Sequence, residues 1–157
     1  MSDTPIKANP YSIGAEQSLI GCLILDKEVI PTVLDVLKKD DFYREDHKEI
    51  YDAVTGLFHK GEPVDIISVS DMLGSKGKLE AVGGLEYLAH ITNAVPTTAN
   101  AGYYAKIIEE KSVLRKIINS CKDIGTAACQ NTDIKQLLGM LDSLQAELDN
   151  RPSHEVK

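Results

Sequence analysis

Two amphipathic stretches near the carboxyl end decide the fold: YYAKIIEEKSVLRKIINSCKDI, residues 103–124, and DIKQLLGMLDSLQAEL, residues 133–148. In the first, apolar residues recur at the three- and four-residue spacing of a helix, and most charged residues fall on the opposite face. The second repeats this pattern after a break of eight residues. Two such helices joined by a short turn predict an antiparallel helical hairpin over residues 98–149.

The predicted hairpin has more apolar surface than its two helices can cover for each other. An apolar edge left in water carries a free-energy cost that a second subunit would remove. The pattern therefore favours self-association through the hairpin, and the alternative is that the hairpin folds back on the rest of the chain. The residues predicted to pair subunits are Ile117, Cys121, Ile134, Leu137, Leu138, Leu141 and Leu144.

The preceding residues 13–97 are predicted to form a globular bundle of five or six helices. Apolar residues recur at helical spacing in several short segments that are separated by Gly, Pro and Asp. Only VDIIS, residues 64–68, is a candidate strand, and it is short. The fold class predicted is thus all-α, a helical bundle followed by a protruding hairpin.

Local signals give the details of this bundle. Phe42 and Tyr43, two of the few aromatic residues, are predicted to be buried in the core. Asp46, with Glu49 three residues later, is predicted to cap one helix, and Ser68, with Asp71, to cap the next.

Composition narrows the class of protein. The chain has 157 residues, 43% of them hydrophobic, but only 5% aromatic and no Trp, so aliphatic side chains must fill its core. Its net charge of −7 opposes strong binding to nucleic acid by this domain alone. No signal peptide and no run long enough to cross a membrane are evident, so a cytoplasmic location is expected.

No catalytic or metal-binding motif emerges from the sequence. The three cysteines, Cys22, Cys121 and Cys129, lack disulfide or zinc spacing and sit among apolar residues, where Cys acts as a small hydrophobe. The four histidines have no partner at ligand spacing, and Gly83–Gly84 is interpreted as a loop before a helix rather than a phosphate-binding turn. We therefore predict a helical association module that holds no cofactor and is not a self-contained enzyme.

Several blocks of sequence are more specific than these patterns. They are PYSIGAEQSLIGCLILD, DDFYREDHKEIYDAV, GEPVDIISVSDML and GGLEYLAHITNAVPTTANAGYYAKIIEEKSVLRK, in that order along the chain. In order and spacing they resemble the N-terminal domain of the bacterial replicative DNA helicase of the DnaB type, over nearly the whole chain.

This resemblance implies a function. In that family the hairpins pair subunits, the N-terminal tier of the hexamer is a trimer of dimers, and this collar receives the helicase-binding domain of primase and, in some bacteria, a helicase loader. The family's RecA-like motor, which uses ATP and Mg²⁺, follows a linker. Residues 150–157 are accordingly expected to be the start of that linker. Residues 1–12 are expected to be a mobile N-terminal arm, because the first ten residues carry two prolines and several polar residues.

The resemblance also suggests contact residues for primase. Matched by motif, they are Tyr87, Ile118 and Ile124, and Gly14 stands where family members more often have Glu. Ile118 and Ile124 fit the buried stripe of the hairpin equally well. Two other functions stay open at this point: a stand-alone helical adaptor or regulator of such a helicase, and a small helical enzyme whose site the sequence does not reveal.

Overall fold

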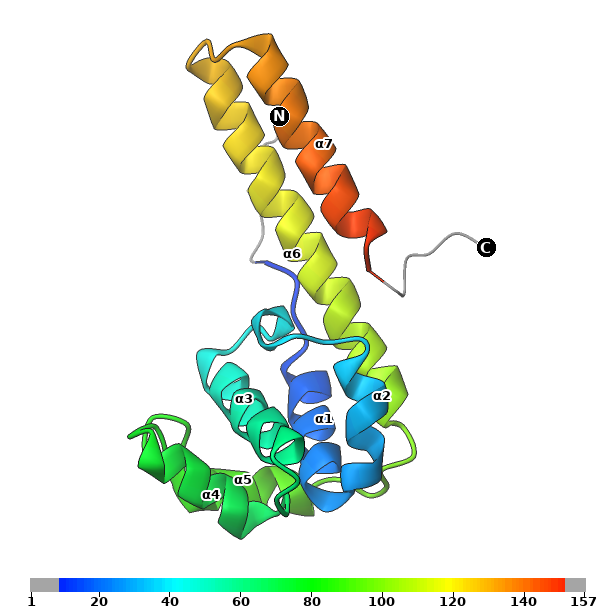
Figure 1. Ribbon diagram of the computed structural model, residues 1–157, viewed down its shortest axis with the longest axis vertical. Helices are drawn as coiled ribbons and strands as arrows, with labels where there is room; N and C mark the ends of the chain where they lie inside the picture. Colours follow the sequence, from blue (N-terminus) through cyan, green and yellow to red (C-terminus); the bar gives the residue numbers. More distant parts are fainter. Residues whose placement is uncertain (1–8, 152–157) are drawn as a thin grey trace, which may run out of the picture. The chain divides into compact units, whose positions relative to one another are not determined.

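The computed structural model describes residues 9–151, and helices joined by turns and loops are the only regular secondary structure within that range (Figure 1). This confirms the predicted all-α class. Residues 1–8 of the predicted arm and 152–157 of the predicted linker lie outside the described part. The elements are α1 (Ile13–Leu25), η1 (Lys27–Val29), α2 (Ile30–Leu34), η2 (Lys39–Asp41), α3 (Glu45–His59), α4 (Ile66–Ser75), α5 (Gly84–Asn93), α6 (Ala101–Cys129) and α7 (Ile134–Asp149), where η marks a single turn of 3₁₀ helix.

The described residues fall into two compact units. One comprises residues 12–109, and the other residues 110–151 together with residues 9–11. Helix α6 begins in the first unit and ends in the second. The division therefore lies inside a continuous helix, whereas the boundary expected from the sequence lies ahead of that helix, between residues 97 and 98.

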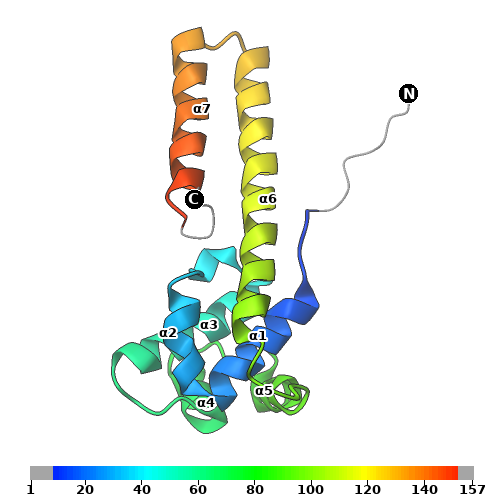
Figure 2. The same cartoon turned by 90° about the vertical axis from the view of Figure 1, so that its right-hand side faces the viewer.

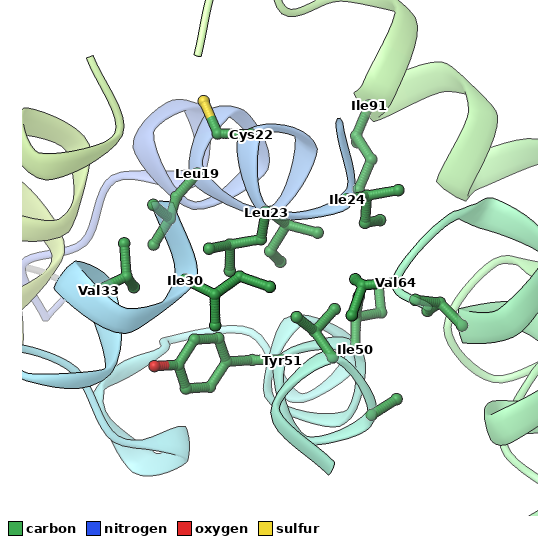
Figure 3. Close-up of a cluster of buried hydrophobic side chains, with 14 of the residues drawn as sticks. Leu19, Cys22, Leu23, Ile24, Ile30, Val33, Ile50, Tyr51, Val64 and Ile91 are labelled. Atoms are coloured by element: carbon green, nitrogen blue, oxygen red, sulfur yellow. The ribbon is translucent and has the colours of Figure 1, made fainter. Parts of the chain in front are cut away.

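The core of the first unit is aliphatic, as the composition predicts (Figure 3). Helix α1 is buried almost all round, because α3 and α5 both pack against it. The beginning of α6 adds small and branched side chains to the same core. The labelled core residues in Figure 3 are Leu19, Cys22, Leu23, Ile24, Ile30, Val33, Ile50, Tyr51, Val64 and Ile91.

Helices α1 and α5 approach each other most closely at Gly21. A Cβ atom built on Gly21 would lie 2.5 Å from Cγ2 of Val95 and 2.7 Å from the carbonyl oxygen of Ile91. Both distances are shorter than van der Waals contact, and the second involves backbone, which cannot turn aside as a side chain can. Glycine at this position therefore sets how closely the two helices pack.

Two predictions about the start of α3 are wrong. Phe42 is fully buried and its ring lies 4.8 Å from that of Tyr51, but the neighbouring Tyr43 is exposed. Asp46 is not the N-cap: Arg44 holds that position without a side-chain cap bond, and Asp46, in the first turn, accepts a hydrogen bond from Arg44 Nε at 3.0 Å. The salt bridge to Arg44 uses the side chain that the prediction assigned to capping.

The N-cap predicted for α4 is also displaced. Helix α4 begins at Ile66, and its N-cap is Asp65, three residues before Ser68. Oδ1 of Asp65 accepts a hydrogen bond from the Ser68 amide at 2.8 Å, and the Asp65 amide donates to Ser68 Oγ at 2.9 Å. This reciprocal capping box places most of the candidate strand VDIIS in a helix.

The capping box gives α4 a pH-dependent contribution to stability. The hydrogen bond from the Ser68 backbone holds the pKa of Asp65 below its ordinary value. A lowered folded-state pKa means that the stabilisation is present above the unfolded-state pKa and is lost as pH falls through the folded-state pKa. Asp65→Ala is expected to cost about 1 kcal/mol at neutral pH, and this cost should shrink in acid.

Urea unfolding followed by circular dichroism at pH 7 and below pH 4 measures both costs. Asp71→Ala is the matched control, since Asp71 is an exposed aspartate on the same helix. An equal cost for the two variants, or a cost at Asp65 that does not change with pH, would contradict the capping role.

The second unit contains an antiparallel hairpin formed by the later turns of α6 and by α7 (Figure 2). Helix α6 ends at Cys129, the first residue of the CQNT turn, and Gly125 lies within the helix. Asn131 adopts a left-handed conformation with φ of 58°, and the Thr132 amide donates to the Ala127 carbonyl at 3.1 Å. This is the way helices commonly end, and asparagine tolerates the conformation better than most residues.

Candidate interaction surface

Helix α7 carries two adjacent rows of apolar side chains, although none of its residues is buried. Each residue advances about 100° around a helix, so residues three, four and seven apart share a face. One row is half-buried and turned toward α6: Leu137, Met140, Leu144 and Leu148. The second row lies beside it and is exposed to solvent. We call it the exposed stripe of α7, and it consists of Ile134, Leu138 and Leu141.

The exposed stripe is large for a free surface. Its three side chains are 72%, 54% and 48% exposed in that order along the helix. A single exposed Leu needs no explanation, but three in succession on one face of one helix are typical of a surface that another helix covers.

Helix α6 shows the same division beyond residue 110. Ile117 and Ile124 are half-buried, whereas Leu114 and Cys121 are exposed on a neighbouring face. An ion pair between Lys116 Nζ, on α6, and Glu147 Oε2, on α7, joins the two helices. The hairpin thus has an inner seam that its own two helices cover and outer apolar positions that they leave open.

This division separates the residues predicted to pair subunits. Ile117, Leu137 and Leu144 lie in the half-buried seam within a single chain. Cys121 and the three residues of the exposed stripe remain open on the surface. The sequence pattern could not distinguish the two sets, because the two rows touch and both have helical spacing.

The residues predicted to contact primase fall in both units. Gly14 is exposed on α1, and a Cβ atom there would meet nothing within 4 Å. Ile118 and Ile124, in the hairpin, are half-buried. Tyr87, on α5, is also half-buried, and its hydroxyl group is hydrogen-bonded to other side chains.

The hydroxyl group of Tyr87 is one end of a hydrogen-bonded chain of side chains that joins three helices. His47, on α3, places Nε2 at 2.7 Å from the Tyr87 hydroxyl and Nδ1 at 2.7 Å from Oε1 of Glu16, on α1. Nε2 of Gln17, also on α1, donates to the same hydroxyl at 3.0 Å. We call Glu16, His47 and Tyr87 the buried relay, because His47 is 0% and Glu16 1% exposed.

Glu16 is the anchor of the buried relay. Its Oε2 accepts a hydrogen bond from the Tyr43 amide at 2.6 Å, and its Oε1 accepts one from the Arg44 amide at 3.4 Å. The guanidinium of Arg44 lies 5.7 Å from the centre of the Tyr87 ring, close enough for a cation–π contact. The Glu16 carboxylate therefore forms hydrogen bonds with two backbone amides just before α3 and with the His47 imidazole.

Sequence reasoning did not find the buried relay. Its members are 31 and 40 residues apart, and no local spacing connects them. One signal was present: Glu16 lies three residues after Ile13 and three before Leu19, on the apolar stripe of α1. A charged residue on a core face requires a polar partner, although the sequence does not identify that partner.

Outside the buried relay, the described part of the chain offers few candidate sites for metal binding or reactive cysteines. Residues 9–151 contain no cluster of His, Cys, Asp or Glu that could hold a metal ion. Cys22 is buried, and burial raises the pKa of its thiol. Cys121 and Cys129 are exposed, so of the three cysteines Cys22 alone lies in the core. Searched over the same residues, the chain has no helix both long and apolar enough to cross a membrane.

Known proteins are similar to this chain in both sequence and fold. Residues 8–110 match the family described as DnaB-like helicase N terminal domain. The replicative DNA helicase DnaB of Leifsonia xyli subsp. xyli is 38% identical over 145 residues, which cover 92% of this chain and 31% of that helicase. The chain therefore spans about a third of the length of that relative.

Two solved structures have the same arrangement of helices. The crystal structure of the N-terminal domain of DnaB helicase from Mycobacterium tuberculosis has a TM-score of 0.80 and 36% identity, covering 91% of this chain and 100% of that one. A structure of a DnaB-like replicative helicase, described together with its interactions with primase, has a TM-score of 0.73 and 25% identity. It covers 85% of this chain and 31% of that one.

Proposed function

Because the chain belongs to the family of DnaB-like helicase N-terminal domains, we propose that it is the collar of a hexameric replicative helicase, where it pairs subunits and docks primase. Pairing and docking are proposed for this chain itself. The collar would couple strand separation to primer synthesis during DNA replication.

The exposed stripe of α7 is the observation that carries the pairing role. Ile134, Leu138 and Leu141 lie on a hairpin whose own seam is already formed by other residues. A second hairpin that brings the same stripe would cover these side chains from both copies at once, as a twofold interface does. Cys121 and Leu114, the exposed positions of α6, are proposed to extend the contact.

The proposed docking role is supported by the similarity of this chain to a helicase that is described with primase. A helicase with 25% identity to this chain is described with its interactions with primase. In the present chain we propose that Tyr87, Ile118 and Ile124 contribute to primase docking, and that Gly14 contributes only its backbone, since it has no side chain. A helicase loader is a further proposed partner of this collar.

The motor activity is proposed for a longer protein rather than for these residues. ATP and Mg²⁺ would bind a motor domain of the kind that makes up the rest of a replicative helicase. The net charge of −7 makes strong binding of nucleic acid by this domain alone unexpected. We propose that the protein acts in the cytoplasm, where the chromosome is copied.

Mass measurement in solution tests both roles. Sedimentation equilibrium of the chain alone should give a dimer or a trimer of dimers, and adding the C-terminal helicase-binding domain of primase should give a heavier complex. A strictly monomeric chain that is indifferent to the primase domain would overturn the proposal.

Two substitutions then separate docking from packing. Ile118→Ala and Ile124→Ala, made singly, are each expected to weaken primase binding about tenfold. Ile67→Ala is the matched control, since Ile67 is an exposed isoleucine on α4 in the other unit. If only self-association falls and primase affinity does not, both isoleucines serve the hairpin and not the partner.

A further inference from the structure

Helix α4 ends in a turn that brings two lysines to carboxylates on α3. Gly77 has φ of 69°, a left-handed conformation that favours glycine. The Lys78 amide donates to the Leu73 carbonyl at 2.8 Å, and the Gly77 amide donates to the Gly74 carbonyl at 3.0 Å. These two bonds form the Schellman motif, a common helix ending. Lys76 and Lys78 stand on either side of the glycine in sequence, and each reaches a carboxylate on α3.

Five side chains form an ion-pair network at this place. Nζ of Lys78 lies 2.9 Å from Oε1 of Glu49, and Nζ of Lys76 lies 3.3 Å from Oδ2 of Asp52. Lys39, on η2, contacts both carboxylates, with its Nζ 3.5 Å from Glu49 and 4.0 Å from Asp52. Glu49 and Asp52 are three residues apart on α3, so they would repel each other without these cations. The network therefore joins η2, α3 and the end of α4.

The segment that follows α4 has little apolar anchoring of its own. We call residues 76–83 the α4–α5 loop. Val82 is the one buried residue of this loop, Leu79 is half-buried, and most of the others are exposed. Segments with few buried apolar contacts open at a lower free energy than the core of a domain does. The ion pairs add a second kind of contact where the apolar one is weak.

We propose that the α4–α5 loop opens locally and that the ion-pair network holds it closed, so that ionic strength controls the opening while the rest of the first unit stays folded. This inference is independent of the proposed function. The side chains of Lys39, Lys76 and Lys78 are 39%, 41% and 43% exposed, so dissolved ions reach them and screen their attraction to the carboxylates.

The network suits a segment that opens and closes. A single exposed ion pair contributes little to stability, whereas several charges joined in a network contribute more. Lys39 belongs to η2 and not to the loop. It can therefore stay beside Glu49 and Asp52 when the loop leaves α3, and the open state does not leave two carboxylates without a cation.

Hydrogen exchange followed by NMR on the full chain measures opening at single amides. The reporters are the amides of Val82 and Gly84, which donate to the carbonyls of Lys78 and Leu79 at 3.2 and 2.9 Å. The reference is the amide of Val54, a buried residue in the middle of α3. Raising NaCl from about 20 mM to about 500 mM should speed exchange at the reporters about fivefold relative to the reference.

Replacing the two loop lysines tests the role of the network directly. Lys76→Gln with Lys78→Gln should speed reporter exchange about fivefold at low salt and remove its dependence on salt. The matched control is Lys48→Gln with Lys60→Gln, which removes the same charge from α3 and its end. Lys48 pairs with Glu45 within the helix at 2.9 Å, and Lys60 is exposed at the C-cap. The control should keep the wild-type exchange and its salt dependence.

Three results would overturn the inference. If Val82 and Gly84 exchange no faster than Val54, the loop opens only when the whole unit unfolds. If salt has no effect on the reporters, or the loop-lysine variant exchanges like the wild type, the ion pairs do not hold the loop. If the control variant speeds reporter exchange as much as the loop-lysine variant does, the effect comes from total charge and not from the network.

Discussion

Replacing Leu138 and Leu141 with glutamate should make the chain monomeric while its helix content stays unchanged. Both side chains belong to the exposed stripe of α7, so each single chain tolerates a charge there. In a dimer each glutamate would have to lose water without gaining a partner, and the twofold axis would bring four such charges together. We expect association to weaken at least about a hundredfold.

Sedimentation velocity over a range of concentrations, with circular dichroism on the same samples, measures this effect. The matched control is the double substitution Gln136→Glu and Ser143→Glu, which adds the same charge to the polar side of α7. The control should associate like the wild type. Dimers that persist in the leucine double variant would mean that subunits pair through another surface.

Adding one methyl group at Gly21 should destabilise the first unit more than any other single change considered. In Gly21→Ala the new Cβ would have to push apart α1 and the backbone at Ile91, or distort Val95. Overpacking of this kind typically costs about 1–3 kcal/mol, and the backbone contact argues for the upper end. The midpoint of thermal unfolding should fall by roughly 5–10 °C.

Gly14 provides the comparison within the same helix. Gly14→Ala adds a methyl group where nothing lies within 4 Å, and alanine is the better helix former. Its unfolding midpoint, read by scanning calorimetry, should stay level or rise slightly. Equal losses for both variants would show that the cost arises in the helix itself and not at its crossing with α5.

Helices with strong apolar periodicity were predictable from the sequence. The two hairpin helices were expected on their periodic stripes, and α6 and α7 lie there. Periodicity is a property of one segment, so neighbouring residues suffice to show it. The family resemblance added what periodicity could not, namely which other proteins share this order of helices.

Helix starts and the burial of single residues were harder to predict. Asp46 and Ser68 both had the chemistry of a cap, but Arg44 bonds to Asp46, and Asp65 is the cap of α4. Phe42 and Tyr43 are adjacent, and the backbone before α3 turns only one of them inward. Such choices depend on contacts that a local pattern does not contain.

The site was only partly predictable for the same reason. The apolar positions of the hairpin follow from sequence spacing, but their division into seam and exposed stripe depends on how α7 is rotated against α6. The buried relay depends on three helices meeting, and only Glu16 on an apolar stripe hinted at it.

Keeping seam and exposed stripe on separate residues has an evolutionary consequence. Leu137 and Leu144 are half-buried and stabilise the hairpin itself. The exposed residues Ile134, Leu138 and Leu141 do not. Changes in shape or charge at those three positions can alter which sister chains are accepted without unfolding the hairpin. A cell that makes two related helicases could keep their subunits from mixing through these few side chains.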